Sequence, residues 1–162
     1  MPFVTDGKAG IDLTRTSTTP EFALGTVVMT DLGGMAEYVQ ALSEISTYAA
    51  VAIFQGFTAR MLETSIAADA GESKKVGFAQ VSIASAYYGW VHRMGKLICN
   101  LSDDCADNVP LFTTATAGYL DDATVSNCLV IGTYLPVTAS IATALTVLAN
   151  MPASVVPYTN PA

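Results

Sequence analysis

Charged side chains are scarce in this chain. Only 13% of its 162 residues are Asp, Glu, Lys or Arg, about half of the share usual in soluble domains, while hydrophobic residues make up 51%. A chain with so little charge has few groups that can keep its whole surface wetted. We therefore expect part of that surface to be buried against other copies of the chain or against a larger assembly.

Positive charge is the scarcer of the two signs. Seven Lys and Arg stand against fourteen Asp and Glu, which gives a net charge of −7, and the seven are scattered along the chain. Proteins that bind DNA or RNA neutralise phosphates with grouped Lys and Arg side chains. The sequence therefore predicts no nucleic-acid partner.

The C-terminal quarter has no charge at all, because residues 123–162 contain no Asp, Glu, Lys or Arg. About 20 apolar residues suffice to cross a bilayer, so this stretch is long enough to hold a membrane span. The most apolar window, residues 128–148, is however interrupted by Gly132 and Pro136 and diluted by Thr and Ser. We predict two buried strands joined by a proline-containing turn, and no membrane partner. The start, MPFVTDGKAG, also lacks the basic and apolar regions of a secretory signal.

Cysteine and histidine are too few to indicate a metal centre. The three cysteines, Cys99, Cys105 and Cys128, fit no zinc or redox spacing, and there is a single histidine. One interpretation is a short-loop disulfide between Cys99 and Cys105. The other, which we favour, is three small apolar core residues in a reducing compartment. The sequence predicts neither a metal nor a cofactor.

Residues 21–150 predict a β domain. Runs of β-branched and aromatic residues alternate with Gly-rich turns at roughly even spacing. This pattern is typical of an all-β fold, a compact β-barrel or β-sandwich of about ten short antiparallel strands. An alternative interpretation places one helix over residues 37–50. The expected strand pairs are 25–31 with 35–42, 49–54 with 57–62, and 109–115 with 118–122. Strands at 75–85 and 87–94 follow the second pair, a turn at 93–96 leads to a strand at 96–101, and strands at 128–135 and 142–149 close the domain.

Both ends of the chain predict non-globular segments. Residues 1–20 mix Gly, Thr, Ser and Pro without a helical or strand period, which indicates an extended N-terminal arm. Its sparse apolar residues would anchor it on a neighbouring surface; they are Phe3, Val4, Ile11 and Leu13. An unanchored terminus is the alternative. Residues 151–162 contain three prolines and predict an irregular C-terminal tail.

Residues 77–95, GFAQVSIASAYYGWVHRMG, hold the only tryptophan and the only histidine. Strand alternation places Tyr88, Trp90 and His92 on one face of a strand. Such a row could bind a ligand, but Tyr and Trp are also favoured on half-buried strands. Catalysis by His92 would need a nucleophile, and the sequence has no Gly-x-Ser-x-Gly elbow. We predict that the row is a core face or a subunit contact and that no residue is catalytic.

Two acidic groups could carry chemistry. The loop from Asp103 to Asn108 is dense in oxygen ligands that suit calcium, but it lacks the EF-hand order, and Asp and Asn are ordinary turn formers. Asp121 and Asp122 could flank a glycosidic bond, although adjacent acidic residues are common at the polar end of a hairpin. We favour the structural interpretation of both groups.

One long segment carries a family resemblance. The run GFAQVSIASAYYGWVHRMGKLICNLSDDCADNVPLFTTATAGYLDD, residues 77–122, resembles the core of head decoration (cement) proteins of tailed bacteriophages. In that group a GFAQV strand leads to a YGWV strand ending in Gly. A polar loop with Cys and Ala, a PL-x-TTATAG-x-LDD hairpin and an Ala- and Thr-rich C-terminal strand follow. The resemblance extends in order over about residues 22–150 and leaves out the N-terminal arm.

The resemblance implies a β-barrel-like domain on the outside of an icosahedral head. Such proteins are commonly trimers clamped over capsid junctions, with terminal arms that reach neighbouring capsomers. We therefore expect a structural virion protein and not an enzyme, with the major capsid protein and other copies of itself, as a homotrimer, for partners. Its place would be the outer surface of the capsid, assembled in the host cytoplasm. Acidic character suits that side, since phosphates inside the head would repel it.

Other classes stay open. A phage tail-fibre or receptor-binding module that binds carbohydrate would share the β-rich, weakly charged composition. A small hydrolase would need a working His92 or the Asp121–Asp122 pair. A self-assembling bacterial shell protein is the third alternative.

Overall fold

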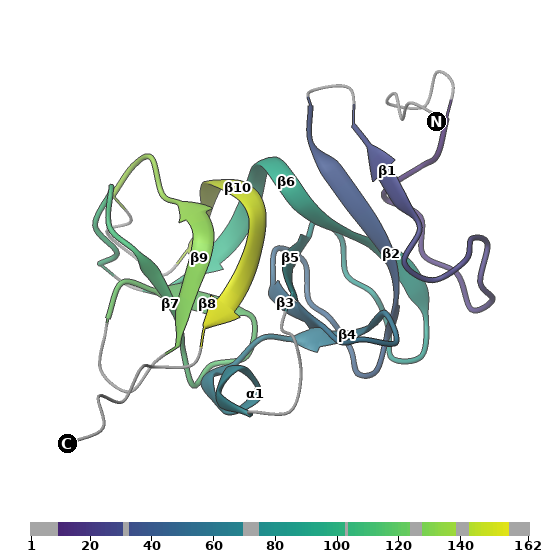
Figure 1. Cartoon of the computed structure of the whole chain (residues 1–162), viewed down its shortest axis with the longest axis horizontal. Coiled ribbons are helices and arrows are strands. Elements are labelled where there is room, and N and C mark those ends of the chain that lie inside the picture. The colour runs from purple at the N-terminus through teal and green to yellow at the C-terminus, as the bar shows by residue number, and fades with distance from the viewer. Residues whose placement is uncertain are drawn as a thin grey trace.

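The structure is a computed structural model that describes residues 10–30, 33–69, 75–102, 104–123, 128–138 and 143–155. Within these residues the fold is mainly β, with ten strands in one mixed sheet and one short helix (Figure 1), as expected from the strand pattern. The elements are β1 (Val27–Met29), β2 (Met35–Ala41), β3 (Ala50–Ile53), β4 (Thr58–Met61), α1 (Thr64–Ala68), β5 (Lys75–Ala79), β6 (Tyr88–Leu101), β7 (Leu111–Thr113), β8 (Tyr119–Asp121), β9 (Leu129–Tyr134) and β10 (Thr143–Val155).

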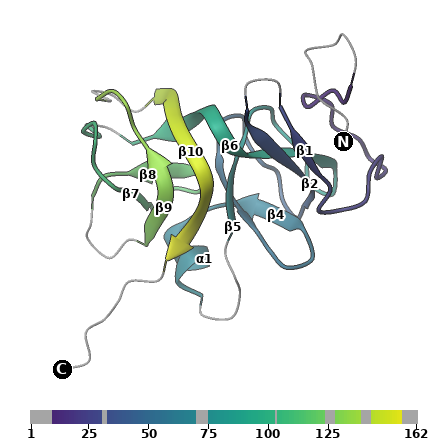
Figure 2. The same ribbon diagram turned by 45° about the horizontal axis from the view of Figure 1, so that its top comes forward.

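The described strands pair in two closed circuits that share β6. The first circuit runs β2–β4–β3–β5–β6 and back to β2, and the second runs β6–β10–β9–β7–β8 and back to β6. In addition, β5 pairs with β10, and β1 pairs with β2. Figures 1 and 2 show β6 between the two groups of strands from two directions. β6 is long because one part of it pairs with β2 and the other with β10.

Two pairings among the described strands are parallel, which corrects the expectation of an entirely antiparallel fold. β2 runs parallel to β4, and β6 runs parallel to β8. Both pairings occur where a circuit closes. β4 forms an antiparallel hairpin with β3 and so comes to lie beside β2. In the same way, β8 forms an antiparallel hairpin with β7 and comes to lie beside β6. Alternating hydrophobicity indicates the strands but carries no information about such partners.

The prediction of a turn at residues 93–96 is wrong, because β6 runs without interruption through this segment. Gly95 has a φ angle of +115°, and a Cβ placed on it would lie 3.1 Å from the Cα of Gly34. The pairing with β2 shifts register at the same place, between Met35 and Ala36. A glycine inside a strand often marks a bulge or a close backbone approach. In β6 it marks the point where the strand passes from the first circuit to the second.

Each circuit surrounds its own hydrophobic core. The side chains of the first core come from all five strands of the first circuit and include Val39, Val51 and Val91. The second core gathers side chains from the second circuit, from β3 and β5, and from α1, where Ile66 and Ala67 are buried. Because β3, β5 and β6 contribute to both cores, the two circuits are packed as one unit.

Two further expectations are corrected. No helix forms over residues 37–50, where β2 and a loop occupy the chain; the helix of the described residues is α1, which the sequence did not indicate. The tail expected at residues 151–162 is a strand as far as Val155, and residues 156–162 lie outside the described part. Pro152 is tolerated there because the pairing of β10 with β9 shifts register between Ala149 and Ala153, and proline is accepted at such bulges.

Candidate functional site

The expected row of Tyr88, Trp90 and His92 lies largely inside the protein. Trp90 is 1% exposed, and its ring packs against Tyr38 at 4.9 Å and Phe22 at 5.3 Å between centroids. Tyr88 stacks on Tyr38 at 6.3 Å. Aromatic pairs of this kind stabilise a fold by about 0.5–1.5 kcal/mol beyond the area they bury. The tryptophan is therefore a core residue of this chain.

The described half of the expected N-terminal arm lies on the same aromatic cluster. Ile11 and Leu13 are half-buried and pack against the group formed by Tyr38 and Trp90. The backbone of Ser17 exchanges two hydrogen bonds with Tyr88, of 3.0 and 2.8 Å. This part of the arm therefore covers the chain's own core. The other two expected anchors, Phe3 and Val4, lie outside the described residues.

His92 lies on β6 between β2 and β5, where its paired residues are Ala36 and Phe78. Both neighbours are apolar and fully buried. Burial disfavours the charged imidazolium and lowers the pKa of His92 from 6.5 to about 4. The imidazole is therefore neutral at physiological pH and packs as part of the sheet.

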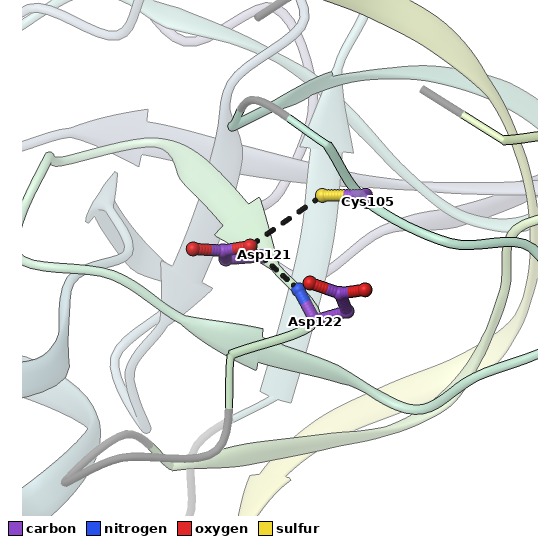
Figure 3. A group of neighbouring side chains, drawn as sticks. All are labelled: Cys105, Asp121 and Asp122. Carbon is purple, nitrogen blue, oxygen red and sulfur yellow. Dashed lines mark hydrogen bonds between the residues drawn. The ribbon is translucent and has the colours of Figure 1, made fainter. Parts of the chain in front are cut away.

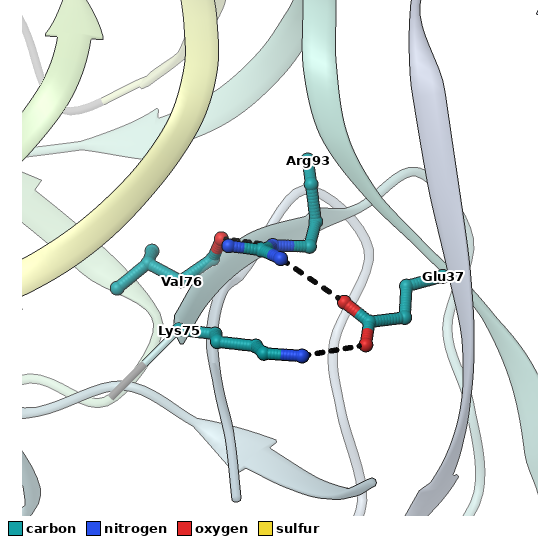
Figure 4. Close-up of polar contacts among 4 residues, drawn as sticks. All are labelled: Glu37, Lys75, Val76 and Arg93. Atoms are coloured by element: carbon teal, nitrogen blue, oxygen red, sulfur yellow. Dashed lines mark hydrogen bonds and ion pairs between the residues drawn. The ribbon is translucent and has the colours of Figure 1, made fainter. Parts of the chain in front are cut away.

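A buried ionic group joins β2, β5 and β6, and the sequence patterns did not predict it. Glu37 is paired with Lys75 at 3.0 Å and with Arg93 at 3.2 Å (Figure 4). Arg93 also donates to the carbonyl oxygen of Val76 at 3.4 Å. The signal that could have revealed the group is a glutamate inside a mostly apolar strand, since a buried carboxylate needs a partner. Its role is to hold three strands of the first circuit together.

A second polar group lies in the second circuit, where Cys105, Asp121 and Asp122 place their ligand atoms within 4.8 Å of one another (Figure 3). The thiol of Cys105 donates to Asp121 at 3.6 Å, and the carboxylate of Asp122 accepts from the backbone amide of Ala106 at 2.9 Å. Burial raises the pKa of Cys105 to about 11, so the thiol keeps its proton and acts as a donor. These bonds tie the loop before β7 to the end of β8.

The same loop has the geometry of a tight turn. Asp104 and Asn108 have φ angles of +56° and +59°, in the left-handed region that Asp and Asn tolerate. Asp107 accepts hydrogen bonds from Asn108 at 2.6 Å and from Thr138 at 3.2 Å. Both contacts support the turn interpretation of this loop, while Asp103 lies outside the described residues.

The cysteines behave as core residues. Cys99, Cys105 and Cys128 are all 0% exposed and belong to the core of the second circuit. Cys99 and Cys105 are free thiols, so the disulfide alternative is wrong and the interpretation as small core residues is confirmed, while the reducing compartment stays a prediction. Among the described residues, no helix has the length and apolar character that crossing a bilayer requires.

Five large apolar side chains on β9, on β10 and in the loop after β9 are exposed, and we call them the β9–β10 patch. Its members are Ile131, Tyr134, Val137, Leu148 and Met151, each between 42% and 51% exposed. Tyr134 lies directly opposite Leu148 in the pairing of the two strands. Met151 lies in the bulge of β10, where the chain has a φ angle of +50°. The patch falls within the charge-free part of the sequence.

A shallow hollow adjoins this patch. It has a volume of about 350 Å³ and lies between β9 and the loop before β7, with Ile131 and Tyr134 on one side and Asn108 and Pro110 on the other. The hydroxyl of Tyr134 donates to the side-chain oxygen of Asn108. The hollow is open and mostly apolar, so it suits an inserted side chain of another protein better than an enclosed small ligand.

No protein-family model matches the chain, and no curated protein sequence matches it significantly.

Proposed function

We propose that the protein is a structural virion protein that binds the outside of a tailed-phage head and stabilises the contacts between major capsid protein subunits. The observation that carries the proposal is the β9–β10 patch, because exposed apolar side chains on adjacent strands, such as Tyr134 and Leu148, mark protein contacts. The resemblance of residues 77–122 to head decoration proteins supplies the class of partner.

The mechanism is a shift of an assembly equilibrium. A ligand that binds the closed shell, and not loose subunits, stabilises the closed state by mass action. If one decoration protein contacts several capsid subunits at once, the later contacts form at high effective concentration. The domain suits this task because side chains of β3, β5 and β6 enter both cores, so the two circuits are packed as one unit.

Binding to assembled heads tests the proposal. The full-length protein would be mixed with heads assembled from the major capsid protein that is encoded with it, and with the same capsid protein left unassembled. We expect cosedimentation with heads only, density on the outer surface by cryo-electron microscopy, and a higher temperature of capsid disruption. Failure to bind heads, or equal binding to loose subunits, would contradict the proposal.

A glycan-binding screen addresses the tail-fibre alternative. A carbohydrate module stacks sugars on exposed aromatic rings, and the ring of Trp90 is buried. Among the residues that the structure describes, the exposed tyrosines Tyr87 and Tyr134 are the available platforms. We expect no glycan to bind. Specific binding that is lost in Tyr87→Ala or Tyr134→Ala would replace the capsid proposal by the receptor-binding one.

A further inference from the structure

We infer that the hollow beside β9 binds an arginine side chain of the major capsid protein, with the methylene stem on the apolar lining and the guanidinium on the carboxylate of Asp107. The inference rests on the proposed function and deepens it. The occupant of the β9–β10 patch stays the same, and the inference names the kind of capsid side chain that this contact recognises.

The lining of the hollow suits an apolar stem. Ile131 and Tyr134 lie on its β9 side, and Val109 and Pro110 lie on the side of the loop before β7. None of the lining residues is charged. Ile131 and Tyr134 are 48% and 43% exposed, so both can be reached from outside. Ligand pockets have volumes of roughly 300–1,000 Å³, and a hollow of about 350 Å³ therefore fits one long side chain.

The carboxylate of Asp107 lies at the rim of this hollow. Its Oδ2 accepts a hydrogen bond of 2.6 Å from the side-chain amide of Asn108, which is a lining residue. The oxygen of the same amide accepts from the hydroxyl of Tyr134, on the other side of the hollow. The second oxygen of Asp107 accepts from Thr138, in the loop after β9, at 3.2 Å. The carboxylate is therefore held in place by the loops on both sides of the hollow.

This carboxylate can bind a cation. No Lys or Arg of the described residues forms an ion pair with Asp107, whose side chain is exposed. A carboxylate accepts about four hydrogen bonds, so the two that it makes leave room for a charged donor. A negative charge at the rim of an apolar hollow favours a side chain with a long apolar stem and a positive end.

Arginine fits this description better than lysine. Its planar guanidinium donates two parallel hydrogen bonds to one carboxylate, whereas the ammonium of lysine acts as a point charge. The guanidinium also stacks on aromatic rings, and the exposed ring of Tyr134 is one hydrogen-bonded amide away from Asp107. Arginine is in addition enriched at protein interfaces and among the residues that contribute most to binding.

The charge of the chain indicates which protein supplies the arginine. Each copy carries a net charge of −7, so two copies repel one another and a second copy is a poor occupant. The capsid protein is the partner under the proposed function. Ile131 and Tyr134 belong both to the hollow and to the β9–β10 patch, so the hollow continues the contact proposed for that protein.

Head binding by two variants tests the inference. Asp107→Asn keeps the shape of the side chain but removes its charge, and should weaken binding to assembled heads about three- to tenfold at low salt. Asp104→Asn is the matched control, because Asp104 is exposed in the same loop, does not line the hollow, and has a left-handed backbone that Asn tolerates. It should change binding less than about twofold. Near 1 M salt, where the Debye length is about 3 Å, the two variants should bind alike.

An isolated side chain tests the hollow without heads. Nα-acetyl-arginine methylamide, added to the full-length protein at millimolar concentration, should shift the amide NMR signals of Ile131, Gly132 and Tyr134. The citrulline derivative, which has the same shape without the charge, should shift them several-fold less. In Asp107→Asn the two derivatives should act alike. Circular dichroism and the unfolding temperature check that each variant is folded.

The outcomes separate this inference from the proposed function. Weaker head binding by Asp107→Asn alone, together with the preference for arginine over citrulline, supports both. If heads bind the wild type and Asp107→Asn equally, or if the citrulline derivative binds the hollow as well as the arginine one, the inference is overturned while the proposed function stands. If the wild type does not bind heads, the proposed function fails, and the capsid protein as the source of the arginine fails with it.

Discussion

Glu37 and Arg93, which are 56 residues apart in the sequence, form an ion pair of 3.2 Å in which both side chains are buried. The side chain of Glu37 is 2% exposed and that of Arg93 is 6% exposed. Lys75, from the strand on the other side of β6, holds the second oxygen of the carboxylate at 3.0 Å. A buried charge is stable only when it is paired, so the three strands β2, β5 and β6 depend on one another at this point.

The first prediction concerns this pair. Arg93→Met should lower the free energy of unfolding by about 3 kcal/mol, since removing one partner of a buried pair leaves an uncompensated charge. Lys75 keeps the loss from being larger. The double variant Glu37→Leu/Arg93→Met should recover most of it, because apolar replacements of a buried pair are often nearly neutral. Urea denaturation measures both, and a single variant within about 0.5 kcal/mol of the wild type would contradict a stabilising pair.

The second prediction compares two glycines. A Cβ at Gly77 on β5 would lie 2.4 Å from a methyl carbon of Val91 and 3.1 Å from the backbone oxygen of His92. Gly77→Ala should therefore destabilise the protein by roughly 1–3 kcal/mol, the usual cost of overpacking. At Gly56 nothing lies within 4 Å, so Gly56→Ala is the matched control and should change stability by less than about 1 kcal/mol. If Gly77→Ala and Gly56→Ala changed the stability equally, the close packing of β5 on β6 would not be the cause of the loss.

The pairing of the strands shows what local sequence patterns could and could not predict. The hairpins β1–β2, β3–β4 and β7–β8 were predictable, because each is closed within a few residues by turn-forming residues. The closure of the circuits was not, since the parallel pairing of β2 with β4 follows from packing between segments distant in the chain. The turn predicted around Gly95 was wrong for a related reason. Glycine usually indicates a turn, but in β6 it permits a close backbone approach within a strand.

The candidate site follows the same rule. The sequence predicted two buried strands within residues 128–148, which lie in a stretch without charge, whereas Tyr134 and Leu148 on these strands are exposed. It could not show that Leu148 lies beside Tyr134 and Lys96, which depends on register between β6, β9 and β10. Trp90 and His92 were candidate functional residues because each is unique in the chain. Their burial and neighbours give them a packing role that uniqueness cannot reveal.

The third prediction is a dependence of stability on pH. The pKa of His92 is about 4 in the folded chain and 6.5 when unfolded, so below pH 6.5 the unfolded state takes up a proton that the folded state does not. Stability therefore falls as the pH drops from 6.5 towards 4, by roughly 2 kcal/mol at pH 5. Because the chain has one histidine, His92→Gln should flatten the profile above pH 5. An imidazole proton signal that titrates near pH 6.5 in the folded protein would contradict this.

The fourth prediction concerns the cysteines. Cys99 and Cys105 are buried thiols, and burial raises the pKa of both, so few thiolates exist at pH 8. The thiolate is the reactive form, and native protein should therefore react slowly with a thiol reagent. After unfolding in guanidinium chloride without reductant, three thiols per chain should react, including Cys128. A count of one would show that a disulfide joins two of the cysteines in solution.

The fifth prediction separates two roles of the N-terminal segment. Ile11 and Leu13 pack on the cluster of Tyr38 and Trp90, so deletion of residues 1–20 should uncover that cluster and lower the unfolding temperature. Such a loss would confuse any test of the capsid-contact arm. Deletion of residues 1–9, which removes Phe3 and Val4, leaves the described contacts in place and is the sharper test. Under the proposed function, the shorter deletion should bind heads several-fold more weakly while unfolding at the wild-type temperature. If it binds with full affinity, Phe3 and Val4 are not capsid contacts, and the β domain itself supplies the attachment.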